Sequence, residues 1–180
     1  MKKSKIVLII FILIVFFVGI YFLNKKNEKP FKEVDIPDTA NYINNRTENK
    51  YIDTVLLLAA NKLGVEGAII SVFPMSDEVR INFERDNNIS LKAFIVGSGY
   101  QYAIFTQDLD RMESITVFSH EMIHLKQYNS NRLIVLGNGV VTWEGQKIEV
   151  NSIPYNDRPW EREAFQNETK LANDLKKILY

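Results

Sequence analysis

The chain contains no cysteine and only two histidines among its 180 residues. Without cysteine, neither a disulfide framework nor a cysteine-ligated metal site can form. Any metal site must therefore use histidine, aspartate and glutamate side chains. Apolar residues make up 46% of the chain and charged residues 24%, which is the balance of an ordinary globular protein. The length is enough for one domain of common size.

An excess of charge of either sign is also missing, because 22 basic residues balance 22 acidic ones. The balance hides an asymmetry: residues 1–30 hold six lysines and a single acid. The rest of the chain carries 16 basic and 21 acidic residues, a net charge of −5. A mildly acidic domain lacks the basic face of a nucleic-acid-binding protein, so we exclude this class of function.

Residues 6–23 form a long apolar run, eighteen residues without a charge. A helix of this length spans roughly 27 Å, close to the thickness of the hydrocarbon core of a bilayer. The sequence therefore predicts a single-pass transmembrane anchor at 6–23, after a basic tail at 1–5 and before a polar tether at 24–49. The alternative is a cleaved signal peptide, but no small-residue cleavage site follows the run.

Lysines flank the apolar run on both sides and leave its orientation open. Lys2, Lys3 and Lys5 favour a cytoplasmic amino terminus. The lysines that follow the run oppose this orientation; they are Lys25, Lys26, Lys29 and Lys32. We favour the orientation given by the short leading tail, which places the domain outside the cytoplasm.

Residues 50–180 have the pattern of an α+β domain. Helical periodicity predicts helices over residues 51–63, 110–128 and 159–179. Runs of branched and aromatic residues predict four strands of one meander, at 67–73, 79–84, 91–96 and 100–106. Two branched runs around a Gly-Asn-Gly turn predict a hairpin or a pair of short strands within 132–150.

The only two histidines, His120 and His124, lie four residues apart in the segment His-Glu-Met-Ile-His. On a helix, such residues differ by ~40° around the axis and by one turn along it, so both imidazoles can approach one cation. Glu121 follows the first histidine, where its carboxylate can reach a water on the metal. This arrangement arises by chance in roughly one sequence in a thousand. The segment therefore predicts a metal site.

A catalytic zinc site needs a third protein ligand and an open position. The start of the last predicted helix is rich in acid, with Glu161 and Glu163 both near it. These two residues differ by roughly 200° around a helix axis, so only one of them can face the metal. A second interpretation stays open, because acids are favoured at a helix amino terminus without any metal.

The two motifs together resemble the gluzincin metallopeptidases, in particular their short single-domain forms, the minigluzincins. The resemblance rests on the His-Glu-Met-Ile-His segment at 120–124 and on Glu-x-x-Ala at 161–164. It implies a zincin-like peptidase domain over 50–180 and a strand, 100–106, that pairs with an extended peptide. The zinc ligands that it implies are His120, His124 and Glu161. The general base that it implies is Glu121.

The chain departs from the family pattern one residue after Glu-x-x-Ala. The family usually has an aspartate there, which orients the first histidine, and this chain has Phe165. The sequence does not identify the residue that orients His120 instead. Tyr155 and Arg158 precede the same helix, and either can donate a hydrogen bond to a developing oxyanion. Alternatively, the tyrosine packs on the hairpin and the arginine pairs with an acid.

These features predict a membrane-anchored zinc peptidase that acts on a peptide or protein substrate. One alternative is a zinc hydrolase for a non-peptide amide. Another is a non-enzymatic, membrane-anchored module that binds a protein or cell-wall partner and keeps zinc in a structural role. Glu121 argues against the second alternative, because a purely structural metal site needs no base.

Overall fold

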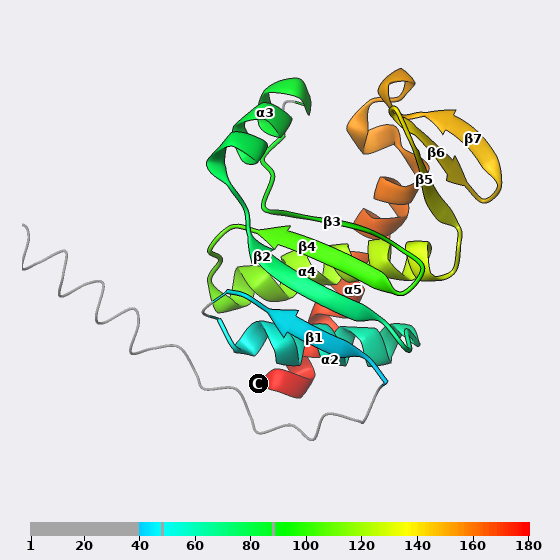
Figure 1. The fold of residues 1–180 in the computed structure, drawn as a ribbon. Helices are drawn as coiled ribbons and strands as arrows, with labels where there is room; N and C mark the ends of the chain where they lie inside the picture. The colour runs from blue at the N-terminus through cyan, green and yellow to red at the C-terminus, as the bar shows by residue number, and fades with distance from the viewer. Residues whose placement is uncertain (1–39, 48, 88) are drawn as a thin grey trace, which may run out of the picture. The chain divides into compact units, whose positions relative to one another are not determined.

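The structure, a computed structural model, describes residues 40–47, 49–87 and 89–180. These residues form an α+β fold with one mixed four-stranded sheet, one three-stranded sheet and four α-helices (Figure 1). No helix among the described residues has both the length and the apolar character needed to cross a membrane. The predicted tail and anchor, residues 1–23, lie outside the described part of the chain, as does most of the predicted tether.

The larger sheet combines parallel and antiparallel strands in the order β1-β2-β4-β3. Its strands are β1 (Tyr42–Asn45), β2 (Ile69–Pro74), β3 (Ala93–Ser98) and β4 (Gln101–Thr106). β2 pairs in parallel with β1 and with β4, whereas β3 and β4 form an antiparallel hairpin. The predicted meander is therefore wrong. Parallel pairs require crossover connections, and helical segments of the chain provide them.

Residues 79–84, predicted as a strand, belong to helix α3 (Asp77–Asn87). Its apolar residues alternate as they would in a strand: Val79, Ile81 and Phe83. The helix has no buried residue, so no neighbouring strand imposes that alternation. Ion pairs of Arg80 with the acids three residues before and four residues after it, at 3.0 and 3.1 Å, stabilise the helical form instead.

Strand β1 lies within residues 24–49, which the sequence predicted to be a tether. Asn41 fixes it beside β2 through two hydrogen bonds to the chain that precedes β2. Its side-chain amide donates to the carbonyl of Val65, and its side-chain oxygen accepts from the backbone N–H of Ala68, both at 2.8 Å. A polar side chain therefore places this strand, which explains why an apolar pattern did not reveal it.

Helices α2 (Tyr51–Leu63) and α4 (Arg111–Asn129) pack against one face of the larger sheet, and α5 (Pro159–Leu179) packs on these two helices (Figure 1). The bounds of α2 and α5 are those that the sequence predicted, and α4 begins and ends one residue later than predicted. Gly64 ends α2 in the left-handed conformation, with φ of 66°. Alternate residues of the central strands fill the core: Ile70, Val72 and Ile104. Each such buried side chain contributes roughly 1.5–3 kcal/mol to stability.

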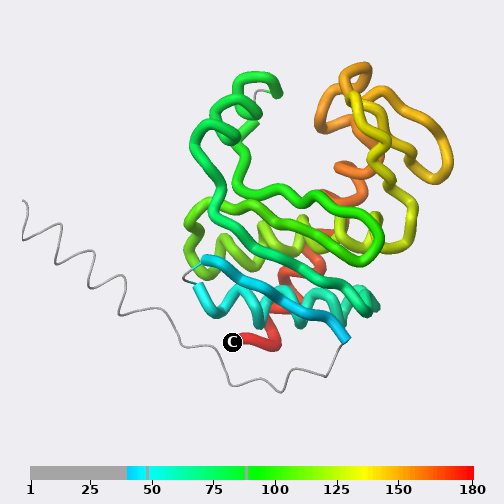
Figure 2. The backbone as a smooth tube through the Cα atoms, in the orientation of Figure 1, coloured from blue at the N-terminus to red at the C-terminus, as the bar shows by residue number. Residues whose placement is uncertain are grey.

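The smaller sheet contains β5 (Leu133–Gly137), β6 (Val140–Trp143) and β7 (Gln146–Glu149), all antiparallel. The prediction of two short strands within 132–150 missed β7. Both turns place two successive residues at positive φ: Asn138 with Gly139, and Glu144 with Gly145. This sheet packs on Trp160 at the start of α5, and Figure 2 shows α5 running from there toward α2.

The edge of the larger sheet beside α4 is β3, and not the strand 100–106 that the sequence predicted, because β4 lies between β2 and β3. The backbone N–H of Gln107 donates to the carbonyl of Lys92 at 2.9 Å, so these two residues form a hydrogen-bonded pair. In an antiparallel hairpin such pairs alternate with pairs that are not hydrogen-bonded. The backbone groups of Ala93 and Ile95 therefore point away from β4, toward the open edge.

Candidate metal centre

Helix α4 carries His120, Glu121 and His124 in its buried middle. The three side chains are only 5–8% exposed, because α4 lies between the sheet and the helices α2 and α5. Asp110 caps the amino end of α4, where its carboxylate accepts a hydrogen bond from the backbone N–H of Glu113 at 2.7 Å. The predicted motif is therefore held on a regular and firmly packed helix.

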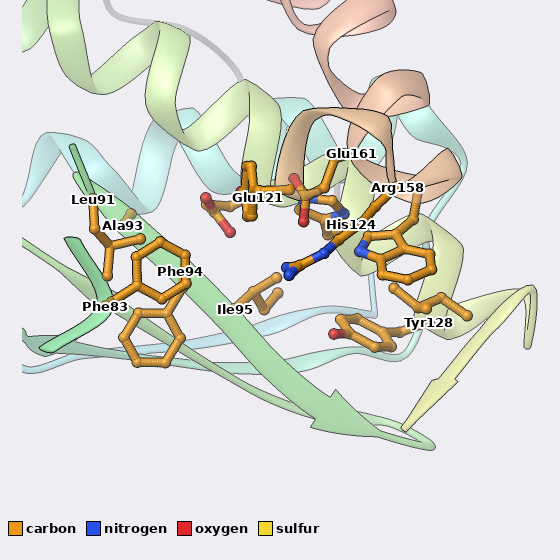
Figure 3. A pocket seen from close by; sticks show the side chains of 13 residues that line it. Phe83, Leu91, Ala93, Phe94, Ile95, Glu121, His124, Tyr128, Arg158 and Glu161 are labelled. Carbon is orange, nitrogen blue, oxygen red and sulfur yellow. The ribbon is translucent and has the colours of Figure 1, made fainter. Parts of the chain in front are cut away.

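Three side-chain atoms converge on one point between α4 and α5, and Figure 3 shows two of the residues that contribute them, His124 and Glu161. His120 Nε2 and His124 Nε2 are 3.1 Å apart. Glu161 Oε2 lies 3.4 Å from the first of these nitrogens and 3.2 Å from the second. In a tetrahedral zinc site with bonds of about 2.0–2.1 Å, two ligand atoms are about 3.3–3.4 Å apart. The three atoms therefore already have the spacing of ligands around a single ion.

Glu168 orients the ring of His120. Its carboxylate oxygen lies 2.8 Å from His120 Nδ1 and accepts the proton of that nitrogen. Phe165, which stands where the family pattern has an aspartate, contacts the same ring with 4.7 Å between centroids. The sequence analysis missed Glu168, although it follows Glu161 by seven residues. Seven residues are nearly two full helical turns, so both carboxylates lie on one face of α5.

Gln127 orients the ring of His124 and joins the two helices. Its side-chain N–H donates to the backbone carbonyl of Trp160 at 3.0 Å, so its oxygen faces His124 Nδ1, 2.8 Å away. His124 must therefore supply the proton of that contact. Since Trp160 immediately precedes Glu161, the same amide fixes both the histidine and the backbone beside the carboxylate.

These hydrogen bonds determine which ring nitrogens carry protons. Both Nδ1 atoms donate, so in the neutral rings both Nε2 atoms present lone pairs. The lone pairs of His120 and His124 then face each other and the carboxylate of Glu161, a set of three acceptors without a donor. A cation resolves this repulsion, and two nitrogens with one oxygen suit a transition metal. The residues therefore fit a metal ion.

The electrostatics of the three side chains agree with this conclusion. Burial disfavours a charge on His120, but hydrogen bonds with Glu161 and Glu168 outweigh burial and raise its pKa to about 10. Burial also disfavours the charge of Glu161, yet the two histidines hold the pKa of its carboxyl well below the usual range. Both shifts show that positive charge is favoured where the rings meet, whether protons or a metal ion carry it.

Glu121 lies next to this cluster and does not belong to it. Burial raises the pKa of its carboxyl, against the attraction of His124 and His120. A backbone hydrogen bond from Ile95 reaches the carboxylate, as expected from the open edge of β3. A carboxyl whose pKa is raised by burial holds a proton more readily, which suits a group that accepts and returns a proton.

Tyr155 belongs to the short 3₁₀ helix η2 (Tyr155–Asp157), which precedes α5. Its hydroxyl hydrogen-bonds with Glu161, and burial together with that carboxylate raises the pKa of the phenol. Its ring meets the ring of Phe83 on α3 edge-to-face, with 5.9 Å between centroids. The residue is thus part of the site and does not pack on the smaller sheet alone.

Glu163 points away from the histidines. Both of its carboxylate oxygens accept hydrogen bonds from Arg132, at 2.7 and 2.8 Å, and Arg132 also pairs with Glu144. The structure therefore brings Glu161, and not Glu163, to His120 and His124. The pairing with Arg132 connects α5 to the beginning of the smaller sheet.

Two cavities meet beside Glu121. One has a volume of about 140 Å³ and extends past Phe83, Ile95 and Arg158 (Figure 3). The other has a volume of about 270 Å³ and extends past Val117 and Glu168. Both also border Ala93 at the open edge of β3, so the candidate site is accessible along this strand.

Comparison of the chain with protein-family models, with curated proteins and with solved structures finds no match.

Proposed function

We propose that the chain is a zinc-dependent peptidase with a zincin-like domain, in which His120, His124 and Glu161 bind the metal. The observation that carries the proposal is the convergence of three acceptor atoms within 3.1–3.4 Å of one another. A buried carboxylate, Glu121, lies directly beside them without joining them. A purely structural metal site does not require this extra acid, whereas hydrolysis does.

Zinc at this point supplies Lewis acidity, because it lowers the pKa of water and polarises a carbonyl oxygen. Glu121 then accepts a proton from the attacking water and delivers it to the leaving amine. Burial raises the pKa of its carboxyl, which favours the step in which it takes up a proton. Tyr155 borders the same cavity and can donate a hydrogen bond to the oxygen on which negative charge develops.

The open edge of β3 supports a peptide as the substrate. Ala93 and Ile95 direct their backbone groups away from β4, to the edge that borders the cavities, and an extended peptide can add to such an edge as a further strand. The hydrogen bond from Ile95 to Glu121 shows that the base lies within reach of this edge. A bound peptide would thus place its scissile amide between the base and the metal ligands.

The test uses the full-length chain in detergent. We expect one zinc per chain by elemental analysis after expression in zinc-replete medium, and cleavage of peptides in a mixed library followed by mass spectrometry. Absence of stoichiometric zinc would contradict the metal assignment. Stoichiometric zinc without cleavage of any peptide would instead favour a non-enzymatic module or a non-peptide substrate.

The apolar run at 6–23 supports a single-pass anchor with the domain outside the cytoplasm. We expect the protein to remain in the membrane fraction after carbonate extraction and to keep its amino terminus. Mature soluble protein that starts near Lys25 would show that the run is a cleaved signal peptide. A reporter fused after Tyr180 determines on which side of the membrane the domain lies.

A further inference from the structure

Arg158 reaches into the cavity beside the metal ligands. Figure 3 shows its guanidinium between the cluster of His124 with Glu161 and the strand residue Ile95. Two contacts hold the side chain: its Nε donates to the carbonyl of Ile153 at 3.3 Å, and its guanidinium carbon lies 5.1 Å from the centre of the Tyr155 ring. The direction of the side chain is therefore fixed by the protein itself.

The two terminal nitrogens of Arg158 have no acidic partner among the residues that the structure describes. The two carboxylates that border the same cavity are occupied by other groups. Glu161 faces the imidazoles, and Glu121 accepts a hydrogen bond from the backbone of Ile95. Arg158 is also the only lysine or arginine among the described residues that line this cavity. A fixed cation thus remains available to a ligand.

Arg132 provides an internal comparison, because it too stacks on an aromatic ring, at 4.7 Å from the centre of Trp143. Its guanidinium is shared by two carboxylates, those of Glu144 and Glu163, at 2.6–3.2 Å. Within the described part of the chain, one of these two stacked arginines is therefore paired with two acids, and the other has no acidic partner beside the candidate active site. A guanidinium presents parallel N–H groups that match a carboxylate in a bidentate pair.

We propose that Arg158 binds a carboxylate of the substrate close to the scissile bond, and that the enzyme selects peptides by this carboxylate. This inference rests on the proposed peptidase function. The carboxylate comes either from an aspartate or glutamate side chain or from the free carboxyl terminus of the peptide. Both sources present the same chemistry to the guanidinium, and matched peptides distinguish them.

The experiment measures binding, so that it does not depend on turnover. The zinc-loaded, full-length Glu121→Gln variant is titrated with hexapeptides that carry one glutamate, or one glutamine, at each position in turn. Each peptide is made as a free acid and as an amide. We expect one site, either a side-chain position or the terminus, where the charged form binds about 10- to 100-fold more tightly than its neutral partner, the scale of a charge-assisted hydrogen bond.

Three variants at two arginines decide which residue is responsible. In Arg158→Gln we expect the preference for the charged form to disappear while zinc content is unchanged. The matched Arg132→Gln variant should keep the preference. In Arg158→Lys the charge remains and the bidentate geometry is lost, so a smaller preference should survive. The same preference in Arg158→Gln as in the parent protein would overturn the proposal, as would equal binding of all charged and neutral pairs.

Turnover of the wild-type chain separates this inference from the function on which it rests. Cleavage with no preference for a charged side chain or for a free carboxyl terminus overturns the inference and leaves the peptidase function standing. A carboxylate preference in binding without cleavage of any peptide contradicts the peptidase function instead. If Arg158→Gln lowers kcat equally for the charged and the neutral form of the preferred peptide, the residue stabilises an oxyanion and the proposal is wrong. An increase in KM for the charged form alone supports it.

Discussion

The two helices that build the candidate metal centre do so in different ways. α4 is enclosed by the sheet, α2 and α5, and its two histidines and glutamate are buried within an apolar surface. α5 buries only one side and exposes the other. The partner of His124 is a neutral amide on α4, that of Gln127, which is 1% exposed. The partner of His120 is a carboxylate on α5, that of Glu168, whose side chain is 21% exposed.

This difference suggests a division of roles. The enclosed helix fixes the positions of the imidazoles, because none of its motif residues can move without disturbing packed neighbours. The amphipathic helix supplies negative charge through Glu161 and Glu168, and its other face remains free for surface ion pairs such as that of Glu163. Changes in α4 should therefore affect stability and metal binding together, whereas changes in α5 should affect metal binding more selectively.

The largest effect is expected when either helix loses a metal ligand. His124→Ala on α4 and Glu161→Ala on α5 should each abolish hydrolysis and weaken zinc binding by more than about 100-fold, beyond the usual effect of a residue that only supports a ligand. Competitive zinc titration measures the affinities. Glu163→Ala is the matched control and should stay within a few-fold of wild type. If Glu163→Ala bound zinc more weakly than Glu161→Ala, the assignment of the third ligand would be wrong.

A large effect confined to activity is expected at Glu121. Glu121→Gln keeps the size of the side chain and removes its proton affinity, so hydrolysis should fall by about 10²- to 10⁴-fold. Zinc content, determined by elemental analysis, should not change, because the residue is not a ligand. Unchanged turnover of a peptide that the wild-type chain cleaves would remove Glu121 from the mechanism.

A smaller effect on the metal alone is expected at Glu168. Glu168→Gln retains an acceptor for His120 Nδ1 and removes the charge that favours a cation, so zinc affinity should fall by about 10- to 100-fold. Thermal unfolding of the metal-free variant should match that of the metal-free wild type, since the side chain is partly solvated. A large loss of stability at constant zinc affinity would contradict the selective role of α5.

The corresponding change on α4 should affect the fold as well. Gln127→Leu leaves the Nδ1–H of His124 buried without a partner, and such a group costs about 1–3 kcal/mol. Denaturant unfolding of the metal-free protein measures this loss, and zinc titration shows whether affinity falls with it. Unchanged stability would show that α4 and α5 do not differ as described.

The smallest effect is expected on the exposed side of α5. Glu163→Gln weakens the ion pair with Arg132, and partly exposed pairs of this kind contribute about 0.2–1 kcal/mol to the free energy of unfolding. Denaturant unfolding at low and high salt should show that the difference shrinks as salt is added. A salt-independent loss of several kcal/mol would mean that this side of α5 is as critical as its buried face.

The sequence predicted those parts of the site that depend on local helical spacing. His120, Glu121 and His124 follow from a single turn of helix, and Glu161 is brought to them by α5. Glu168 shows what such a pattern omits. It stands two turns beyond Glu161 on the same face, a position that helical geometry makes plausible. Only the packing of α5 against α4 reveals which of several acids meets a histidine.

The sequence analysis failed where long-range contacts decide the structure. Residues 79–84 alternate like a strand, but α3 lies outside the sheet and its exposed face tolerates any pattern. β1 has no apolar run, and its position depends on hydrogen bonds of Asn41 with residues more than twenty positions away. The order of strands in the sheet, which makes β3 the edge, follows from the parallel pairing of β2 with β4.

The distance along the chain between the metal ligands has a consequence for a protein without cysteine. His124 and Glu161 are 37 residues apart, and a metal ion bound by both closes that loop as a covalent cross-link would. Closing a loop of this length costs the unfolded chain roughly 3 kcal/mol of conformational entropy. Coordination would thus restrain the chain as a disulfide does, yet a chelator would release it and a reductant that does not bind metal would not. A phosphine reductant should therefore leave the domain intact under conditions where chelators loosen the docking of α5.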